Sequence, residues 1–336
     1  MSAGSRTGAR PADRAAGRPG AGAARRPAAR ARSRSPRRTA AALWGFTRPH
    51  TIIGTTLSVV GLYAIVVAEL PGLSLGDGLA NLGWTLVAAW CVNVYIVGIN
   101  QLEDVEIDRI NKPFLPVAAG DLSPAAGWRI VVACAVIPLV LAVTQGVAEL
   151  VAVALGLAIG TAYSVPPLRL KRFPVLASLS ITFVRSVVVN VGVWLHFSQA
   201  FGGGSSIHPA VWALIAVTVP FSFAIAILKD MPDVEGDRRY AIATFSVRLG
   251  ARPVFALGLA VLTLGELGMA TVGAALLDDA NTAVLVGGQL AACAVLWVCA
   301  ARTDLSDRAS ITRFYMRVWL LFFAEYAIVA AAYLLA

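Results

Sequence analysis

Apolar residues fill long stretches of this chain from about residue 51 to the C-terminus, and few polar positions interrupt them. Each stretch approaches the roughly 20 residues that a helix needs to cross the hydrocarbon core of a bilayer. Segments such as 130–143 and 147–162 contain almost no polar residues, so helices there would lack the hydrophilic face of a helix on a soluble protein. The pattern therefore predicts an all-α protein with several membrane-spanning helices.

The spacing of these stretches predicts nine spanning helices, near residues 51–68, 82–103, 124–144, 147–163, 174–198, 208–229, 253–276, 283–301 and 315–335. The loops between them alternate in charge. Lysine and arginine occur in the loops after the second, fourth, sixth and eighth helices, and neither occurs in the other four loops. Because basic loops face the cytoplasm, the alternation places the N-terminus and the charged loops on the cytoplasmic side.

Composition agrees with a membrane protein. Of the 336 residues, 58% are hydrophobic and only 14% are charged. A soluble domain carries roughly 25% charged residues, so this chain has too few to cover a surface that faces water. The four cysteines lie in apolar segments and form no CxxC pair, which argues against both a disulfide framework and a cysteine metal site.

The net charge of +9 comes from the N-terminus, because residues 1–50 contain twelve arginines and one acid. We expect residues 1–43 to be a disordered basic tail and residues 44–336 to be the membrane domain. The tail favours contact with anionic lipid over nucleic acid, so we expect no nucleic-acid partner. A chloroplast-like transit peptide is the alternative, since the tail lacks the apolar core of a secretory signal.

Two groups of oxygen-bearing side chains lie at the cytoplasmic ends of the second and sixth predicted helices. They are Asn100, Asp104 and Asp108 in the first group, and Asp230, Asp233 and Asp237 in the second. Spacings of three or four residues place each group on one helical face, provided that the sixth helix continues past Pro232. The two groups look like halves of one site at the membrane edge.

Facing carboxylates repel one another unless cations bind between them. Mg²⁺ binds through one or two carboxylates together with substrate phosphates, so the two groups predict a site for Mg²⁺ and a diphosphate. Basic residues on the same side would bind the remaining negative charge: Arg48, Arg169, Lys171, Arg172 and Lys229. A hydrocarbon tail on the diphosphate could then lie among the spanning helices. For either motif alone, the alternative is a solvated acidic loop with a few salt bridges.

Several ionisable residues fall inside the predicted spans, where facing lipid would cost several kcal/mol. Arg185 could bind the carboxylate of an acceptor, because a guanidinium matches that group. An ion pair with Glu266 or Glu325 is the alternative for Arg185 and the favoured one of the two. His50 and Asn190 are further candidates for acceptor binding, although a histidine in such a place is more often a packing residue. His196 is likewise more often a packing residue than a substrate ligand, while Tyr95 and Asn93 could line the pocket.

The chain also resembles a known family through motifs longer than these groups. The run Asn100-Gln101-Leu102 to Pro116, together with Arg48-Pro49-His50-Thr51, Tyr163-Ser164 and Lys229-Asp230 through Asp237, is similar to the UbiA superfamily of intramembrane prenyltransferases. The branch it resembles is that of the homogentisate prenyltransferases, in which Gln101 stands where many members have aspartate. The resemblance covers about residues 44–336.

The resemblance implies a nine-helix bundle with a central cavity, with Mg²⁺ and the diphosphate held by the six residues of the two groups. It also places diphosphate contacts at Tyr163 and Lys171. The implied reaction is the loss of diphosphate to give an allylic cation, attack by an electron-rich ring, and departure of a proton or a carboxyl group. The substrates would be a prenyl diphosphate and a homogentisate-like phenolic acid.

Two other functions remain open at this stage. A terpene cyclase of the same superfamily would need the same metal site but would trap the cation with its own double bonds. A cation transporter would place carboxylates near the bilayer midplane, whereas these acids gather at one face. Neither the prenyl chain length nor the identity of the acceptor follows from the sequence.

Overall fold

The computed structural model describes residues 35–336, so residues 1–34 of the expected tail lie outside the described residues. Within the described part every regular element is helical. The α-helices are α1 (Pro36–Phe46), α2 (Pro49–Glu69), α3 (Leu79–Glu103), α4 (Val105–Asn111), α5 (Pro124–Gln145), α6 (Val147–Ser164), α7 (Pro174–Thr182), α8 (Val189–Ala200), α9 (Pro209–Leu228), α10 (Val234–Arg239), α11 (Phe245–Leu249), α12 (Ala251–Gly268), α13 (Ala274–Leu276), α14 (Thr282–Ala301) and α15 (Arg308–Leu334). Short 3₁₀ segments are η1 (Leu170–Arg172) and η3 (Met231–Asp233), and π-helical segments are η2 (Phe183–Val188) and η4 (Met269–Gly273).

The nine predicted spanning helices are confirmed within residues 35–336. Nine helical runs are long and apolar enough to cross a membrane, and they cover 49–69, 79–103, 124–145, 147–164, 174–200, 209–239, 251–276, 282–301 and 308–334. The fifth run joins α7, η2 and α8 into one helix, and the seventh joins α12, η4 and α13. The chain is therefore an integral, multi-pass membrane protein.

The compact unit of the structure begins at Pro36, so the expected boundary between residues 43 and 44 falls inside α1. Residues 36–43 are helical here rather than part of a tail. Ala42 and Phe46 are buried, and the ring of Phe46 lies against Gly98 of α3. One apolar face of α1 therefore packs on the bundle while its arginines stay exposed.

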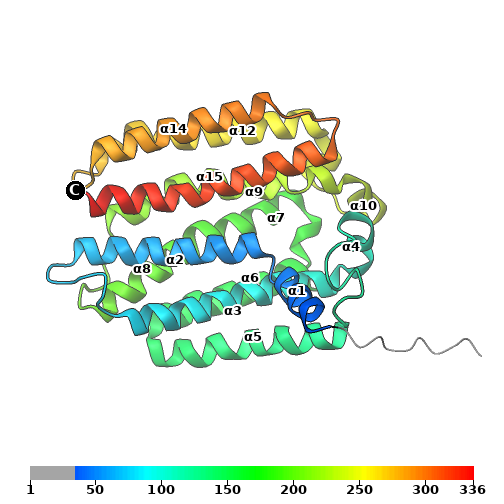
Figure 1. Ribbon diagram of the computed structural model, residues 1–336, viewed down its shortest axis with the longest axis horizontal. Helices are drawn as coiled ribbons and strands as arrows, with labels where there is room; N and C mark the ends of the chain where they lie inside the picture. Colours follow the sequence, from blue (N-terminus) through cyan, green and yellow to red (C-terminus); the bar gives the residue numbers. More distant parts are fainter. Residues whose placement is uncertain (1–34) are drawn as a thin grey trace, which may run out of the picture. The chain divides into compact units, whose positions relative to one another are not determined.

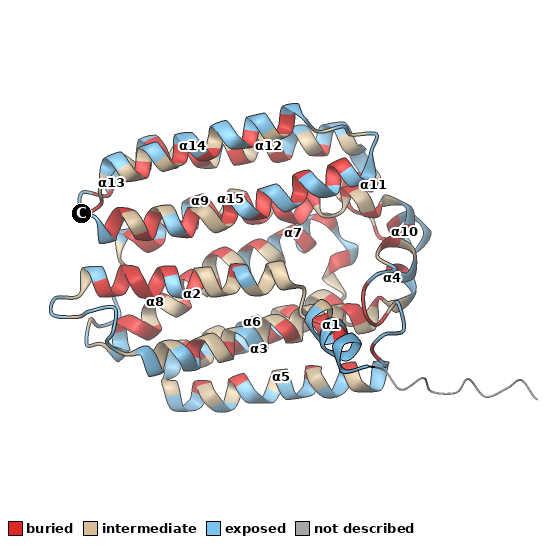
Figure 2. Cartoon of the chain, in the orientation of Figure 1, coloured by how far each residue is buried: buried red, intermediate tan, exposed pale blue. Residues whose placement is uncertain are grey.

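The spanning helices lie side by side, with α9, α2 and α15 nearest the centre and α5 and α14 at the margins (Figures 1 and 2). Helix α9 packs against α12 and α15, α2 packs against α15 and α3, and α3 packs against α5 and α6. Close approach of α3 to its neighbours needs glycine at several positions. At Gly98, for example, an added Cβ would lie 2.8 Å from a Val131 methyl group and 2.9 Å from the Phe46 ring.

Local sequence signals start and stop these helices. Proline occupies the first turn of α2, α5, α7 and α9, where its missing N–H has no helical partner to lose. Side-chain caps precede α5, α14 and α15, and the Asp307 carboxylate accepts from the backbone N–H groups of Ala309 and Ser310. Gly146, at φ 119°, allows the tight reversal from α5 to α6.

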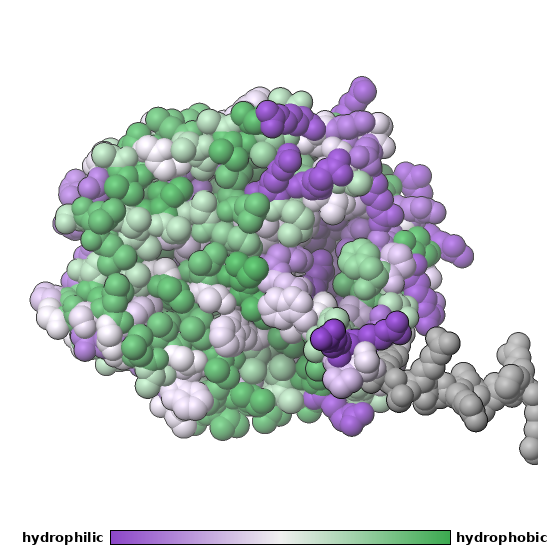
Figure 3. All heavy atoms as spheres, in the orientation of Figure 1, coloured by the Kyte–Doolittle hydropathy of each residue, from purple (hydrophilic) through white to green (hydrophobic). Residues whose placement is uncertain are grey.

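The surface divides as a membrane protein requires. Hydrophobic residues cover the flanks of the long helices, and hydrophilic residues gather at the end that carries α4, α10 and α11 (Figure 3). The face seen in Figure 3 is hollowed near that end, and hydrophilic residues lie in the hollow. The two aspartate motifs belong to this end of the bundle.

Candidate active site

A cavity of about 820 Å³ opens at this hydrophilic end and runs between the spanning helices. Its wall is built from α3 and α6, from the α7–η2–α8 run, and from the first turns of α2 and α15, and the ends of α9 and α10 add the aspartates. All six predicted metal ligands line it: Asn100, Asp104, Asp108, Asp230, Asp233 and Asp237. The fold thus brings both motifs to one mouth.

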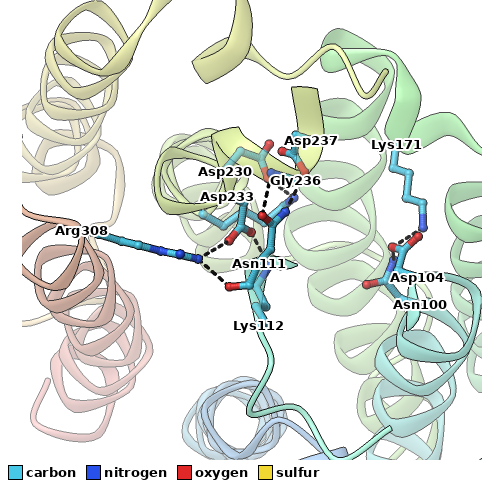
Figure 4. Close-up of polar contacts among 11 residues, drawn as sticks. Asn100, Asp104, Asn111, Lys112, Lys171, Asp230, Asp233, Gly236, Asp237 and Arg308 are labelled. Carbon is cyan, nitrogen blue, oxygen red and sulfur yellow. Dashed lines mark hydrogen bonds and ion pairs between the residues drawn. The ribbon is translucent and has the colours of Figure 1, made fainter. Parts of the chain in front are cut away.

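The first motif lies where α3 gives way to α4. Asp104 has φ −110° and ψ 18°, so it interrupts the helix, yet its N–H still donates to Asn100 O at 3.0 Å and its C=O accepts from Asp108 N at 2.8 Å. The three side chains therefore keep nearly helical spacing. Asn100 Nδ2 donates to Asp104 Oδ2 at 3.1 Å, and Lys171 forms a close ion pair with the same oxygen (Figure 4). Arg169 Nη2 lies 2.9 Å from Asp104 Oδ1.

The second motif does not continue as an α-helix, because α9 ends at Leu228 and Pro232 sits inside the 3₁₀ turn η3. Asp233 forms a close ion pair with Lys112 and lies 3.9 Å from Arg308 Nη2. Lys229 Nζ lies 2.6 Å from Asp230 Oδ1. The turn still presents the three aspartates to the cavity, so the break in the helix does not disperse them.

Asn111 links the two motifs. Its Nδ2 donates to Asp237 Oδ1 at 3.2 Å, and its Oδ1 accepts from the Gly236 N–H at 3.0 Å (Figure 4). A Cβ at position 236 would lie 2.3 Å from Asn111 Oδ1, so glycine is needed for this approach. Arg308 Nη2 donates to Asn111 O at 2.5 Å. Asn111, Lys112 and Arg308 belong to the site, although no local pattern in the sequence indicates a role for them there.

Burial changes the protonation of the first motif. The pKa of Asp108 is raised to about 6, because burial disfavours its charged form more than Lys112 favours it, and the negative charges of Asp104 and Asp233 raise the pKa further. Burial also lowers the pKa of the Lys171 ammonium, against the opposing effect of Asp104. Both groups are more than 90% shielded from solvent, so their charges depend on one another and on any bound ion.

The predicted diphosphate-binding residues divide into three sets. Arg48, Tyr163, Lys171 and Lys229 line the cavity. Arg169 reaches the site through its ion pair with Asp104. Arg172 is exposed and lies outside the lining, so the structure does not bring it to the mouth.

Arg185 lies in the π-helical segment η2, on the cavity wall and beside α15. Its guanidinium carbon is 4.7 Å from the centre of the Trp319 ring and 5.7 Å from that of Phe322. No carboxylate lies within ion-pair distance of it in the described chain, so the favoured expectation of a pair with Glu266 or Glu325 is wrong. Glu325 instead accepts from Gln289 Nε2 at 2.6 Å.

Three buried nitrogen atoms on this wall have no hydrogen-bond partner among residues 35–336: Arg185 Nη1, His50 Nε2 and Trp319 Nε1. The His50 ring meets the Trp319 ring edge-on, with centroids 5.0 Å apart. All three side chains line the cavity. Unpaired buried donors are costly, so this wall is suited to an oxygen-bearing ligand.

Asn190 lies away from this wall. It is fully buried, donates to Ser186 O and Thr218 Oγ1, and accepts from the Tyr326 hydroxyl. The structure thus does not bring it to the cavity. Asn93 lines the cavity as expected, whereas Tyr95 does not.

The side chains at the mouth fit a hard cation, because five carboxylates and one amide offer oxygen atoms as metal ligands. The two motifs do not converge on a single point, since Asp104 with Asn100 and Lys171 lies apart from the aspartates of the second motif, which gather around Asn111 (Figure 4). Within residues 35–336, one trio of metal-ligand side chains has its atoms within 4.8 Å of one another: Glu69, His208 and Asp279, at the opposite end of the bundle.

Comparisons with known proteins agree with this geometry. A sequence model of the UbiA prenyltransferase family matches residues 52–321. The homogentisate phytyltransferase of Synechocystis sp. is 45% identical over 297 residues, which are 86% of this chain and 94% of that protein. The homogentisate solanesyltransferase of Arabidopsis thaliana, a chloroplastic protein, is 35% identical over 290 residues, which are 85% of this chain and 75% of that one.

A solved structure of a UbiA homologue from Archaeoglobus fulgidus, bound to DMAPP and Mg²⁺, has a TM-score of 0.59 to this chain. It is 17% identical and covers 85% of this chain and 98% of that one. At this identity the likeness supports the fold, and the expected nine-helix architecture is confirmed.

Proposed function

This chain belongs to the UbiA prenyltransferase family, and we propose that it transfers a prenyl group from a prenyl diphosphate to a homogentisate-like phenolic acid. It is a prenyltransferase rather than a transporter. The single observation that best supports the full proposal is the joining of two aspartate motifs, from helices far apart in sequence, at the charged mouth of one apolar cavity.

We propose Mg²⁺ as the cofactor, held by Asn100, Asp104, Asp108, Asp230, Asp233 and Asp237. When bound there, Mg²⁺ would neutralise the negative charge that develops on the departing diphosphate. Lys171 and Lys229 already lie among these carboxylates and would bind the remaining phosphate oxygens. Arg48 and Tyr163 line the same mouth and complete the diphosphate site, while Arg169 positions Asp104.

Ionisation breaks the bond between the allylic carbon and the diphosphate oxygen, and both bonding electrons leave with the diphosphate. The apolar walls below the mouth keep water from the cation that remains. The phenolic ring then attacks the allylic carbon and becomes aromatic again when the attacked ring carbon loses its proton. With homogentisate, the side-chain carboxylate also leaves as CO₂, and a proton takes its place on the methylene carbon. The chain's task is to hold the two substrates in contact while water is excluded.

We place the acceptor on the wall formed by Arg185, His50 and Trp319. A carboxylate there would pair with the guanidinium and accept from the indole N–H. Replacing Arg185 with lysine or alanine is expected to raise KM for a carboxylated acceptor at least tenfold, with less than a threefold change in KM for the prenyl diphosphate. An unchanged acceptor KM contradicts this placement.

We also propose that the mouth faces the cytoplasm. The arginines and lysines of the described loops gather at the end that carries α4 and α10, and basic loops stay on the cytoplasmic side of a membrane. Single cysteines introduced at exposed positions of these loops should be protected from an impermeant thiol reagent in sealed right-side-out vesicles, whose interior is the cytoplasmic side. Their labelling from outside would reverse the assignment.

The direct test uses purified protein in lipid nanodiscs with Mg²⁺, a prenyl diphosphate and homogentisate. We expect equal amounts of CO₂ and a prenylated hydroquinone, and no product when Mg²⁺ is chelated. A panel of phenols without the carboxyl group establishes how strictly the acceptor is chosen. A cyclic hydrocarbon formed from the diphosphate alone would identify a terpene cyclase instead.

A further inference from the structure

The deep part of the cavity is an apolar channel whose walls include three long helical faces. On α3 its lining residues recur at helical spacing from Asn100 down to Thr85, and on α6 they recur from Tyr163 down to Glu149. Such stripes are single faces of helices. On the third helix the lining ends at Gly192 and Val193 of α8. Between the mouth and these last residues, the lining is mostly apolar side chains and glycine.

A polar network closes the far end of this channel. No lining residue precedes Thr85 on α3 or Glu149 on α6, and the Thr85 hydroxyl donates to Glu149 Oε2 at 3.2 Å. Behind them, His196 Nδ1 lies 3.4 Å from the same Oε2, and His196 Nε2 lies 2.6 Å from Asn81 Oδ1. Asn81 and His196 do not line the cavity.

This closing network is buried and internally bonded, with Thr85, Glu149 and His196 each at most 5% exposed. Polar groups in such a place are stable only while they remain hydrogen-bonded. A hydrocarbon chain that reached further would have to separate Glu149 from Thr85 and His196 and leave them unpaired. The network is therefore a barrier to an apolar chain, and we call Thr85, Glu149, His196 and Asn81 the cavity floor.

The distance from mouth to floor matches a particular chain length. Residues 85 to 100 of α3 rise about 22 Å, and residues 149 to 163 of α6 rise about 21 Å, at 1.5 Å per residue. Carbon bonds near 1.5 Å advance an extended chain by about 1.25 Å per atom, so one isoprene unit spans about 5 Å. Four units need about 20 Å, whereas nine units need about 45 Å.

We propose that the cavity floor sets the upper limit of the prenyl donor at about four isoprene units, with Glu149 and Thr85 as the residues that determine specificity. This inference rests on the proposed prenyl transfer and adds the chain length, which the sequence left open. The mouth fixes the diphosphate, so the floor meets the other end of the chain.

The test compares variants that deepen the channel with one that shortens it. Glu149→Ala and Thr85→Ala open the floor from α6 and α3. Ala89→Leu fills the α3 stripe one turn nearer the mouth, about 16 Å from Asn100. Glu149→Gln keeps the size of the floor, and Val151→Ala removes a similar volume from the exposed face of α6. Each purified protein is assayed for kcat/KM with donors of three, four, five and nine isoprene units.

We expect the unmodified protein to use the five-unit donor at least tenfold less well than the four-unit donor. With the five-unit donor, kcat/KM of Glu149→Ala or Thr85→Ala should be at least fivefold higher than that of the unmodified protein. The kcat/KM of Ala89→Leu should fall tenfold with the four-unit donor and less than threefold with the three-unit donor. Glu149→Gln and Val151→Ala should keep the original profile. Equal use of four and nine units by the unmodified protein, or the same profile for Glu149→Ala and Val151→Ala, overturns the proposal.

A second measurement separates this proposal from the proposed function. Displacement of a radiolabelled four-unit prenyl diphosphate is measured with Mg²⁺ and no acceptor, for every donor length. A sharp fall in competition beyond four units, without transfer to any acceptor, would leave the length limit standing and overturn the transfer reaction. Transfer with no such fall would overturn the length limit alone. Competition also gives a result for any variant that folds but turns over slowly.

Discussion

Asp104 of the first motif pairs with two cations of a single connection, whereas Asp233 of the second motif lies beside cations from two separate parts of the chain. Asp104 meets Arg169 and Lys171, both from the short connection between α6 and α7. Asp233 meets Lys112, which follows α4, and Arg308, which begins α15. The partners of Asp104 thus come from one connection, whereas those of Asp233 join α4, α15 and the turn that follows α9.

This difference suggests different tasks for the two motifs. Lys171 beside Asp104 lies on the cavity wall, and so do Lys112 and Arg308 beside Asp233. Those beside Asp233 also hold α4 and α15 in place, because Arg308 donates to the Asn111 carbonyl. We therefore expect changes at the first motif to affect substrate binding and changes around the second to affect stability as well.

Removal of one carboxylate from either motif has the largest expected effect. Asp104→Asn and Asp233→Asn should each lower kcat/KM at least 1,000-fold, because charge on the leaving diphosphate loses a counter-ion in a shielded site. The exposed neighbours Glu106 and Glu235 provide matched controls, and their glutamine variants should stay within twofold. Steady-state assays over a range of Mg²⁺ concentrations make the measurement. Equal losses in the controls would mean that net charge, and not the site, is responsible.

Loss of a cation from the first motif should affect donor binding alone. Lys171→Met is expected to raise KM for the prenyl diphosphate about 30-fold with the Tm within 2 °C, since a charge-assisted phosphate contact of about 2 kcal/mol disappears. Arg172→Met alters the adjacent residue, which is exposed, and should change KM less than twofold. Similar effects for both variants would remove the distinction between them.

Breaking the link between the motifs should reduce stability more than donor binding. Asn111→Ala leaves the Gly236 N–H and the Asp237 carboxylate without their partner, at a cost of about 1–3 kcal/mol in the free energy of unfolding. We expect a lower Tm and a several-fold higher Mg²⁺ requirement. Gly236→Ala should act in the same direction, since its Cβ would overlap Asn111. A normal Tm in both variants would contradict the supporting role of the second motif.

The smallest effect concerns pH. With its pKa raised to about 6, Asp108 is ionised at pH 7 and mostly protonated at pH 5, so a cation ligand is lost as the pH falls. The Mg²⁺ concentration for half-maximal activity should rise about tenfold between these values, one logarithmic unit per pH unit below the pKa. Asp108→Asn should be less active and should show a weaker dependence on pH, to which the other buried carboxylates of the site still contribute. A steep dependence that persists in Asp108→Asn would assign it to another carboxylate.

Much of this fold could be predicted from the sequence, because membrane-spanning helices can be recognised from local composition alone. Each of the nine predicted helices agrees with the structure to within a few residues, apart from the start of α15 and the end of the sixth run, where polar turns extend the helical run. The aspartates could be grouped by their spacing within single helices. These signals need no knowledge of which helices are neighbours.

The partners of those aspartates could not be found in this way. Lys112 and Asp233 are separated by 121 residues, and Arg308 and Asn111 by 197. Only the packing of α4, α10 and α15 brings them together, and no local pattern reports that packing. The wrong prediction for Arg185 has the same cause. Charge balance suggested an ion pair, but the packing of the helices places its guanidinium against aromatic rings.

Arg185 has a consequence for how the proposed reaction cycle ends. Its guanidinium finds no carboxylate in the described part of the chain, so the acceptor would be its only anionic partner within the cavity wall. Once CO₂ departs, that partner is gone. The product keeps the contacts of its hydroxyl groups and its contacts with apolar walls, and the latter are much like those it would find in lipid. Decarboxylation would then weaken product retention at the moment of formation, which lets a very hydrophobic product leave for the bilayer without inhibiting the next turnover.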